Sequence, residues 1–157
     1  MKFILVEDDD NKLEDVRKFI HSEYGNVTLR EAASYQSALK LLIQEQFDVV
    51  LLDMTIPTFD KSDVHSAGQL RRLGGEDLLD QIYRRDIAGR IIIVTGYDML
   101  GVGDSVRPLQ KVVKELKERY PAMLAGAVFY SRAEERWKTE LKALIDQVGV
   151  KQGGDAT

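Results

Sequence analysis

Two kinds of hydrophobic spacing alternate along the chain. Short, almost uninterrupted apolar runs, at residues 49–52 and 91–94 for example, are typical of strands buried on both faces of a parallel sheet. Between such runs, apolar residues recur every three or four positions, which is the spacing of one face of a helix. The pattern predicts strands at residues 2–7, 27–32, 47–53, 90–95 and 126–130. It predicts helices at residues 11–24, 35–45, 75–85, 108–120 and 134–148.

This alternation of strands and helices predicts an α/β fold. Right-handed connections between parallel strands place helices on both faces of one sheet. We therefore expect a doubly wound, five-stranded parallel sheet, with helices 11–24 and 134–148 together on one face. Residues 1–150 are expected to form one domain, followed by a polar, frayed tail at 151–157. Residues 58–74 form a long polar stretch without a clear period, and residues 97–107 contain glycines and are expected to be a loop.

Acidic and hydroxyl side chains stand at the ends of three predicted strands. Glu7 and Asp8 follow the first strand, Asp53 ends the third, and Thr95 ends the fourth. The carboxyl ends of parallel strands meet at one edge of a sheet, where such sheets hold their ligands. Grouped carboxylates bind hard divalent cations such as Mg²⁺, and a carboxylate can also act as a nucleophile. The strand ends therefore predict a divalent-metal site whose nucleophile is Asp53.

Composition and charge narrow the class of protein. The chain of 157 residues has a net charge of −4, which does not favour non-specific binding to nucleic acid. It has no cysteine, which excludes disulfides and thiolate metal sites. Its first apolar run is too short for a signal peptide, and no run approaches the roughly 20 residues that cross a bilayer. We expect a cytoplasmic protein without direct contact to DNA or a membrane.

In their order along the chain, five segments resemble the receiver domain of two-component response regulators. They are ILVEDD at 4–9, LLDMTIP at 51–57, GEDLLDQI at 75–82, IIVTGY at 92–97 and AGAVFY at 125–130. The resemblance extends from Phe3 to Val148. It implies a flavodoxin-like (βα)5 fold in a stand-alone, atypical receiver. It also implies a phospho-acceptor that is not an enzyme, apart from self-catalysed phosphoryl transfer and dephosphorylation.

The resemblance also implies roles for individual residues. Asp53 would accept the phosphoryl group, Thr95 would hydrogen-bond to it, and Tyr130 would be the switch aromatic that follows Thr95 inward. The implied Mg²⁺ ligands are three carboxylates and one backbone carbonyl, from Glu7, Asp8, Asp53 and Thr55. A histidine kinase or phosphotransfer protein would donate the phosphoryl group. A downstream protein, or a second copy in a homodimer, would receive the signal.

Three features depart from the family pattern. The family carries a lysine shortly after its fifth strand, whereas ungapped alignment places Ala133 there, and the neighbouring cation is Arg132. The insertion at 58–74 contains several charged or ionisable residues, namely Asp60, Lys61, Asp63, His65, Arg71 and Arg72. It could cover the site, supply a cation or bind a partner. The segment at 97–125 is also longer than usual.

These departures leave an alternative function open. The chain could be a pseudo-receiver, an interaction module that signals without phosphorylation. A metal-dependent phosphohydrolase on a similar sheet is disfavoured. Such enzymes often need a second acid two residues after the nucleophile, where this chain has Thr55.

Overall fold

A computed structural model describes residues 1–59, 74–101 and 103–155. A parallel sheet forms its centre, built from β1 (Lys2–Val6), β2 (Thr28–Ala32), β3 (Val49–Leu52), β4 (Arg90–Thr95) and β7 (Leu124–Phe129). The strand order is β2-β1-β3-β4-β7, and every neighbouring pair is parallel. The predicted doubly wound sheet is therefore confirmed. The winding reverses between β1 and β3, so the carboxyl ends of these two strands form the switch point of the sheet.

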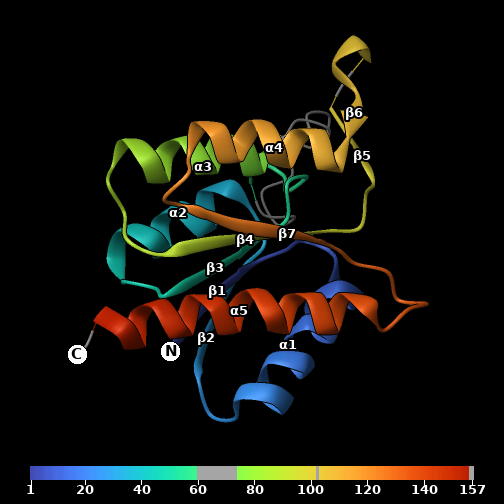
Figure 1. Cartoon of the computed structure of the whole chain (residues 1–157). Coiled ribbons are helices and arrows are strands. Elements are labelled where there is room, and N and C mark those ends of the chain that lie inside the picture. Colours follow the sequence, from blue (N-terminus) through green and yellow to red (C-terminus); the bar gives the residue numbers. More distant parts are fainter. Residues whose placement is uncertain (60–73, 102, 156–157) are drawn as a thin grey trace.

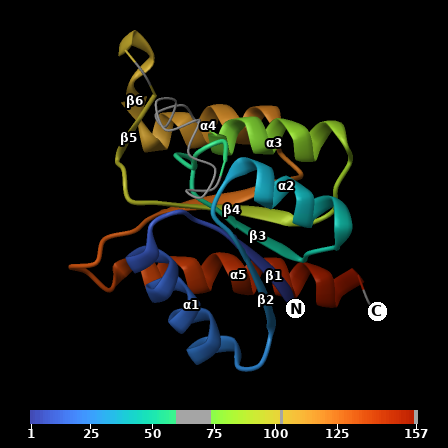
Figure 2. The same ribbon diagram turned by 180° about the vertical axis from the view of Figure 1, so that it is seen from behind.

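Helices cover both faces of this sheet (Figure 1). Helices α1 (Asp10–Tyr24) and α5 (Arg136–Asp155) lie on one face. Helices α2 (Tyr35–Gln44), α3 (Gly74–Arg84) and α4 (Leu109–Arg119) lie on the other, and Figure 2 shows the same two layers from behind. The prediction that the first and last helices share a face is confirmed.

Alternation along the strands produces two apolar cores. In β1, Phe3 and Leu5 pack towards α1 and α5, whereas Ile4 and Val6 pack towards α2, α3 and α4. Successive strand side chains point to opposite faces, so a strand between two helical layers must be apolar at every position. All of these side chains are buried, which explains the uninterrupted apolar runs in the sequence.

Side-chain caps fix where the first two helices begin. Oδ1 of Asp9 accepts hydrogen bonds from the backbone N–H groups of Asn11 and Lys12, which starts α1 at Asp10, four residues after the last residue of β1. Ser34 and Ser37 form a reciprocal capping box at the start of α2. These caps satisfy N–H groups that have no partner within the helix. The link between β1 and α1 is consequently short and rigid, and it carries Glu7 and Asp8.

The prediction of a loop at residues 97–107 was wrong in part. Two short strands, β5 (Met99–Leu100) and β6 (Arg107–Pro108), pair in antiparallel fashion, with a 3-10 turn η2 (Gly103–Ser105) between them. Leu100 is buried in the core beside α4, and Arg107 pairs with Glu115 of α4 at 2.7 Å between Nη2 and Oε2. One buried side chain and one ion pair therefore hold a hairpin that projects beyond the sheet (Figure 1).

Other boundaries shift by a few residues. Pro108 belongs to β6 and precedes α4 instead of lying in its first turn, and β7 begins at Leu124. Helix α5 begins at Arg136 and continues to Asp155, past the predicted end at residue 148, since no proline interrupts it. The ionisable residues named for the insertion, from Asp60 to Arg72, lie outside the described residues, as does the end of the tail at 156–157.

Gly75 of α3 packs closely against the backbone that follows β3. A Cβ added to Gly75 would lie 2.6 Å from Cα of Met54 and 2.8 Å from the backbone oxygen of Asp53. Alanine improves helix propensity by up to about 1 kcal/mol. Overpacking against backbone costs about 1–3 kcal/mol, so the cost of the clash outweighs the gain in helix propensity. We expect Gly75→Ala to lower the free energy of unfolding, measured in urea.

Gly96→Ala is the matched control, because the nearest atom to its added Cβ is 3.8 Å away. That variant should unfold at a urea concentration close to the wild-type midpoint. Equal midpoints for Gly75→Ala and wild type would show that the contact between α3 and the backbone of residues 53–54 is looser than described.

Candidate functional site

The carboxyl edge of the sheet holds a cluster of buried polar residues. Glu7, Asp53 and Thr95 are at most 4% exposed, although all three are polar. The backbone N–H of Glu7 donates to Ala32 and that of Asp53 donates to Val6, so both residues continue the pairing of the sheet. The sheet therefore fixes the positions of both carboxylates.

These carboxylates open into a pocket of about 770 Å³. The residues that line it include most of the predicted site residues, namely Glu7, Asp8, Asp53, Thr55 and Tyr130. Thr95 lies beneath the surface at the end of β4, where its hydroxyl accepts a hydrogen bond from the N–H of Tyr97 at 3.3 Å. The edge of the sheet thus brings the predicted residues to one place, with Thr95 behind the pocket wall.

Three carboxylates form a possible metal site. Glu7, Asp8 and Asp53 each offer an oxygen, and these oxygens lie within 4.8 Å of one another. Carboxylate oxygens are the ligands that Mg²⁺ prefers, and Mg²⁺ commonly takes only one or two of them from the protein. The donor set and its spacing fit a hard divalent cation. All three carboxylates line the pocket, so each is a candidate ligand.

Both oxygens of Glu7 already have partners. Oε2 accepts from the backbone N–H groups of Asp8 and Asp9 at 3.1 and 3.0 Å. Oε1 lies 2.5 Å from Nζ of Lys12. Burial raises the pKa of Glu7 to about 7, opposed by the charge of Lys12 and assisted by that of Asp53. Glu7 is therefore a fixed member of a charge network as well as a candidate metal ligand.

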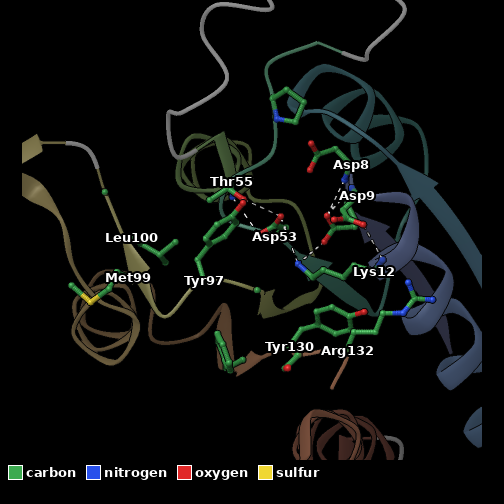
Figure 3. Close-up of a pocket in the computed structure, with 16 residues that line it drawn as sticks. Asp8, Asp9, Lys12, Asp53, Thr55, Tyr97, Met99, Leu100, Tyr130 and Arg132 are labelled. Carbon is green, nitrogen blue, oxygen red and sulfur yellow. Dashed lines mark hydrogen bonds and ion pairs between the residues drawn. The ribbon is translucent and has the colours of Figure 1, made fainter. Parts of the chain in front are cut away.

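Thr55 holds the Asp53 carboxylate through two hydrogen bonds. The Thr55 hydroxyl donates to Oδ2 of Asp53 at 3.1 Å, and the Thr55 N–H donates to Oδ1 at 3.4 Å. Figure 3 shows the Thr55 side chain beside Asp53, away from Lys12. These contacts orient the Asp53 carboxylate.

Lys12 is a residue of this site that the sequence pattern did not predict. Its side chain is only 6% exposed, and its Nζ lies 2.6 Å from the backbone oxygen of Val94 and 3.6 Å from Oδ2 of Asp53. A usable signal was present, because Lys12 stands four residues before Val16, on the buried stripe of α1. A lysine in the first turn also opposes the helix dipole, so it needs a nearby negative partner.

Tyr130 and Arg132 both face α1. The Tyr130 hydroxyl donates to Oδ2 of Asp15 at 2.5 Å, and Nε of Arg132 lies 3.5 Å from the same oxygen. Burial, together with the hydrogen bond to Asp15, raises the pKa of Tyr130, which keeps its hydroxyl protonated. The Tyr130 ring also packs against Trp137, with ring centres 5.2 Å apart. Arg132 is thus paired elsewhere, and among the described residues the cation paired with Asp53 is Lys12.

Comparison with known proteins assigns the family. Residues 3–107 match the model of the response regulator receiver domain. The chain belongs to the response regulator receiver family. Receiver domains are phospho-acceptor signalling modules of two-component systems rather than enzymes. None of the helices in the described ranges is both long and apolar enough to cross a membrane.

Individual relatives match the receiver over most of its length, and solved structures share its fold. The receiver is 32% identical over 150 residues to the Detocs response regulatory protein DtcB of Enterobacter cloacae, covering 94% of this chain and 100% of that protein. A CheY-like receiver domain from Methanospirillum hungatei has a TM-score of 0.64 at 17% identity, covering 98% and 97% of the two chains. The response regulator TrrA of Thermotoga maritima, solved with Mg²⁺ and BeF, has a TM-score of 0.56 at 21% identity, covering 92% and 99%.

The carboxylate geometry predicts how Mg²⁺ binding responds to substitution. Asp8→Asn removes one negative charge from the site and should weaken Mg²⁺ binding by about fivefold or more, since a unit charge about 4 Å away is worth roughly 1–4 kcal/mol. Isothermal titration calorimetry measures the affinity.

Asp10→Asn is the matched control, because Asp10 is an exposed acid in the first turn of α1 and outside the carboxylate group. The Mg²⁺ affinity of Asp10→Asn should stay close to that of wild type. An equal loss in both variants would mean that Mg²⁺ responds to overall negative charge instead of this site.

Proposed function

We propose that this receiver accepts a phosphoryl group on Asp53 in a Mg²⁺-dependent reaction and transmits the signal by protein contact. The observation that carries the proposal is the placement of Asp53. Its carboxylate stands at the switch point of the sheet, within 4.8 Å of the oxygens of Glu7 and Asp8. Membership of the receiver family supports the same role.

The geometry suits nucleophilic attack by a carboxylate. An Asp53 oxygen would form a bond to phosphorus while the bond from phosphorus to the donor's leaving atom breaks. That atom is a ring nitrogen for phosphohistidine or an oxygen for acetyl phosphate, and it takes the electron pair. Thr55 orients the nucleophile through its two hydrogen bonds. Mg²⁺, when bound, supplies positive charge that offsets repulsion between the carboxylate and the phosphoryl oxygens. TrrA was solved with both Mg²⁺ and BeF, which supports the same ligand chemistry here.

The proposed partners follow from this reaction. A histidine kinase or a phosphotransfer protein would supply the phosphoryl group in the cytoplasm. A downstream protein, or a second copy of the chain, would read the changed surface. The hairpin of β5 and β6 supports an altered contact surface, since Met99 and Val106 are 48% and 45% exposed there.

The second candidate is a pseudo-receiver that acts without phosphorylation. It is favoured by the loop after β7, where Arg132 pairs with Asp15 instead of the phospho-acceptor. It is opposed by Lys12, which brings a cation to Asp53 from another element.

Intact-protein mass spectrometry tests the proposal directly. Wild-type protein incubated with acetyl phosphate and Mg²⁺ should gain the mass of one phosphoryl group. The adduct should be absent in Asp53→Asn and in the presence of a metal chelator, because both the nucleophile and the charge neutralisation are then lost. Asp10→Asn should gain the adduct as wild type does, because this exposed residue lies outside the carboxylate group.

Two results would contradict phosphorylation at Asp53. Wild-type protein without an adduct would favour the pseudo-receiver. An adduct that persists in Asp53→Asn would place the phosphoryl group on another residue.

A further inference from the structure

Among the described residues, two acceptors lie at hydrogen-bond distance from the Lys12 ammonium group, which leaves one of its donors for a new ligand. An ammonium carries three N–H donors. Val94 O at 2.6 Å and Glu7 Oε1 at 2.5 Å are at hydrogen-bond distance from Nζ. Oδ2 of Asp53 lies at 3.6 Å, which is ion-pair distance but too long for a hydrogen bond. The third donor is therefore near Asp53 without being satisfied by it.

The surrounding structure holds this ammonium in place. The backbone N–H of Lys12 donates to the Asp9 cap, which fixes the first turn of α1. The side chain is 6% exposed, and Nζ lies 5.9 Å from the centre of the Tyr130 ring. Figure 3 shows the lysine reaching from α1 across the pocket floor towards Asp53. The position of the charge is thus set by a helix cap, a backbone carbonyl and a carboxylate.

A phosphoryl group on Asp53 would place more negative charge beside this donor. The phosphoryl group carries a charge of about −1.5 to −2 at neutral pH and adds strong acceptor oxygens. Buried charges require partners, and charge-assisted hydrogen bonds to phosphate are stronger than neutral ones. Arg132 is turned towards Asp15, so Lys12 is the better placed of the two cations.

We propose that Lys12 donates a hydrogen bond to the phosphoryl group on Asp53, so that a residue of α1 supplies the cation that holds this group. The proposal rests on the phosphorylation of Asp53 proposed above. It explains how a receiver without a lysine after its last strand still presents an ammonium to the phospho-acceptor. It also explains why a lysine is buried in the first turn of α1.

Binding of beryllofluoride, a phosphoryl mimic, tests the contact without any transfer step. Fluorine NMR of the complex at saturating Mg²⁺ measures its affinity for wild type, Lys12→Gln and Lys18→Gln. Lys18 is the matched control on the same helix, 72% exposed and paired with Glu14. We expect Lys12→Gln to bind beryllofluoride about tenfold or more weakly, from the loss of a charge-assisted hydrogen bond, and Lys18→Gln to match wild type.

Mg²⁺ affinity separates this contact from a structural role. Lys12→Gln should bind Mg²⁺ at least as tightly as wild type, because the substitution removes a positive charge from the metal site. Loss of Mg²⁺ binding together with beryllofluoride would show that Lys12 only holds the site together, and would overturn the proposal. Equal beryllofluoride affinity in all three proteins would overturn it as well.

A measurement on the wild type covers the case in which Lys12→Gln does not fold. The ammonium ¹⁵N resonance of Lys12 should shift when beryllofluoride is added to the Mg²⁺-bound protein, and that of Lys18 should not. An unshifted Lys12 resonance would overturn the proposal.

The two proposals fail differently. Wild type that binds beryllofluoride but gains no adduct from acetyl phosphate would overturn phosphoryl transfer, while the variants still decide the Lys12 contact. Wild type that gains no adduct and also binds no beryllofluoride would overturn both.

Discussion

The site depends on one buried charge network at the carboxyl edge of the sheet. Lys12 lies between Glu7 and Asp53, and all three side chains are at most 6% exposed. Buried ion pairs contribute little net stability, because desolvation cancels much of the attraction. Removing one partner is costly, since it leaves an uncompensated charge. Such a network is better explained by function than by stability, and its position beside a candidate phospho-acceptor agrees with that explanation.

The fold makes this network possible through two local constraints. The winding of the sheet reverses between β1 and β3, which brings Glu7 and Asp53 to adjacent strand ends. The Asp9 cap then starts α1 so early that the first helical turn still lies over the edge of the sheet. Lys12 is consequently delivered from the helix that directly follows the first acidic residues. The same face of the sheet carries Tyr130 and Trp137, so the charge network adjoins the packing of α1 against α5.

Strong local patterns made most of the fold predictable from the sequence. The apolar runs gave the five central strands, and parallel topology then placed Asp53 beside Glu7 and Asp8. The hairpin at β5 and β6 was missed because two-residue strands have no period to detect, and a single buried Leu100 anchors them. Lys12 was not predicted because the family pattern pointed to a cation after β7, and the other candidate cations stand in the insertion at 58–74. Arg132 was considered there, yet its contact with Asp15 depends on a tertiary arrangement that spacing does not reveal.

The most direct test is a crystal structure of the protein with Mg²⁺ and beryllofluoride. We expect beryllium bonded to an Asp53 oxygen, with the Lys12 Nζ at hydrogen-bond distance from a fluoride and the Asp8 carboxylate at the metal or on one of its waters. A fluoride contacted by Arg132, with Lys12 still held by Glu7 and Val94 alone, would contradict the claim that α1 supplies the site's cation.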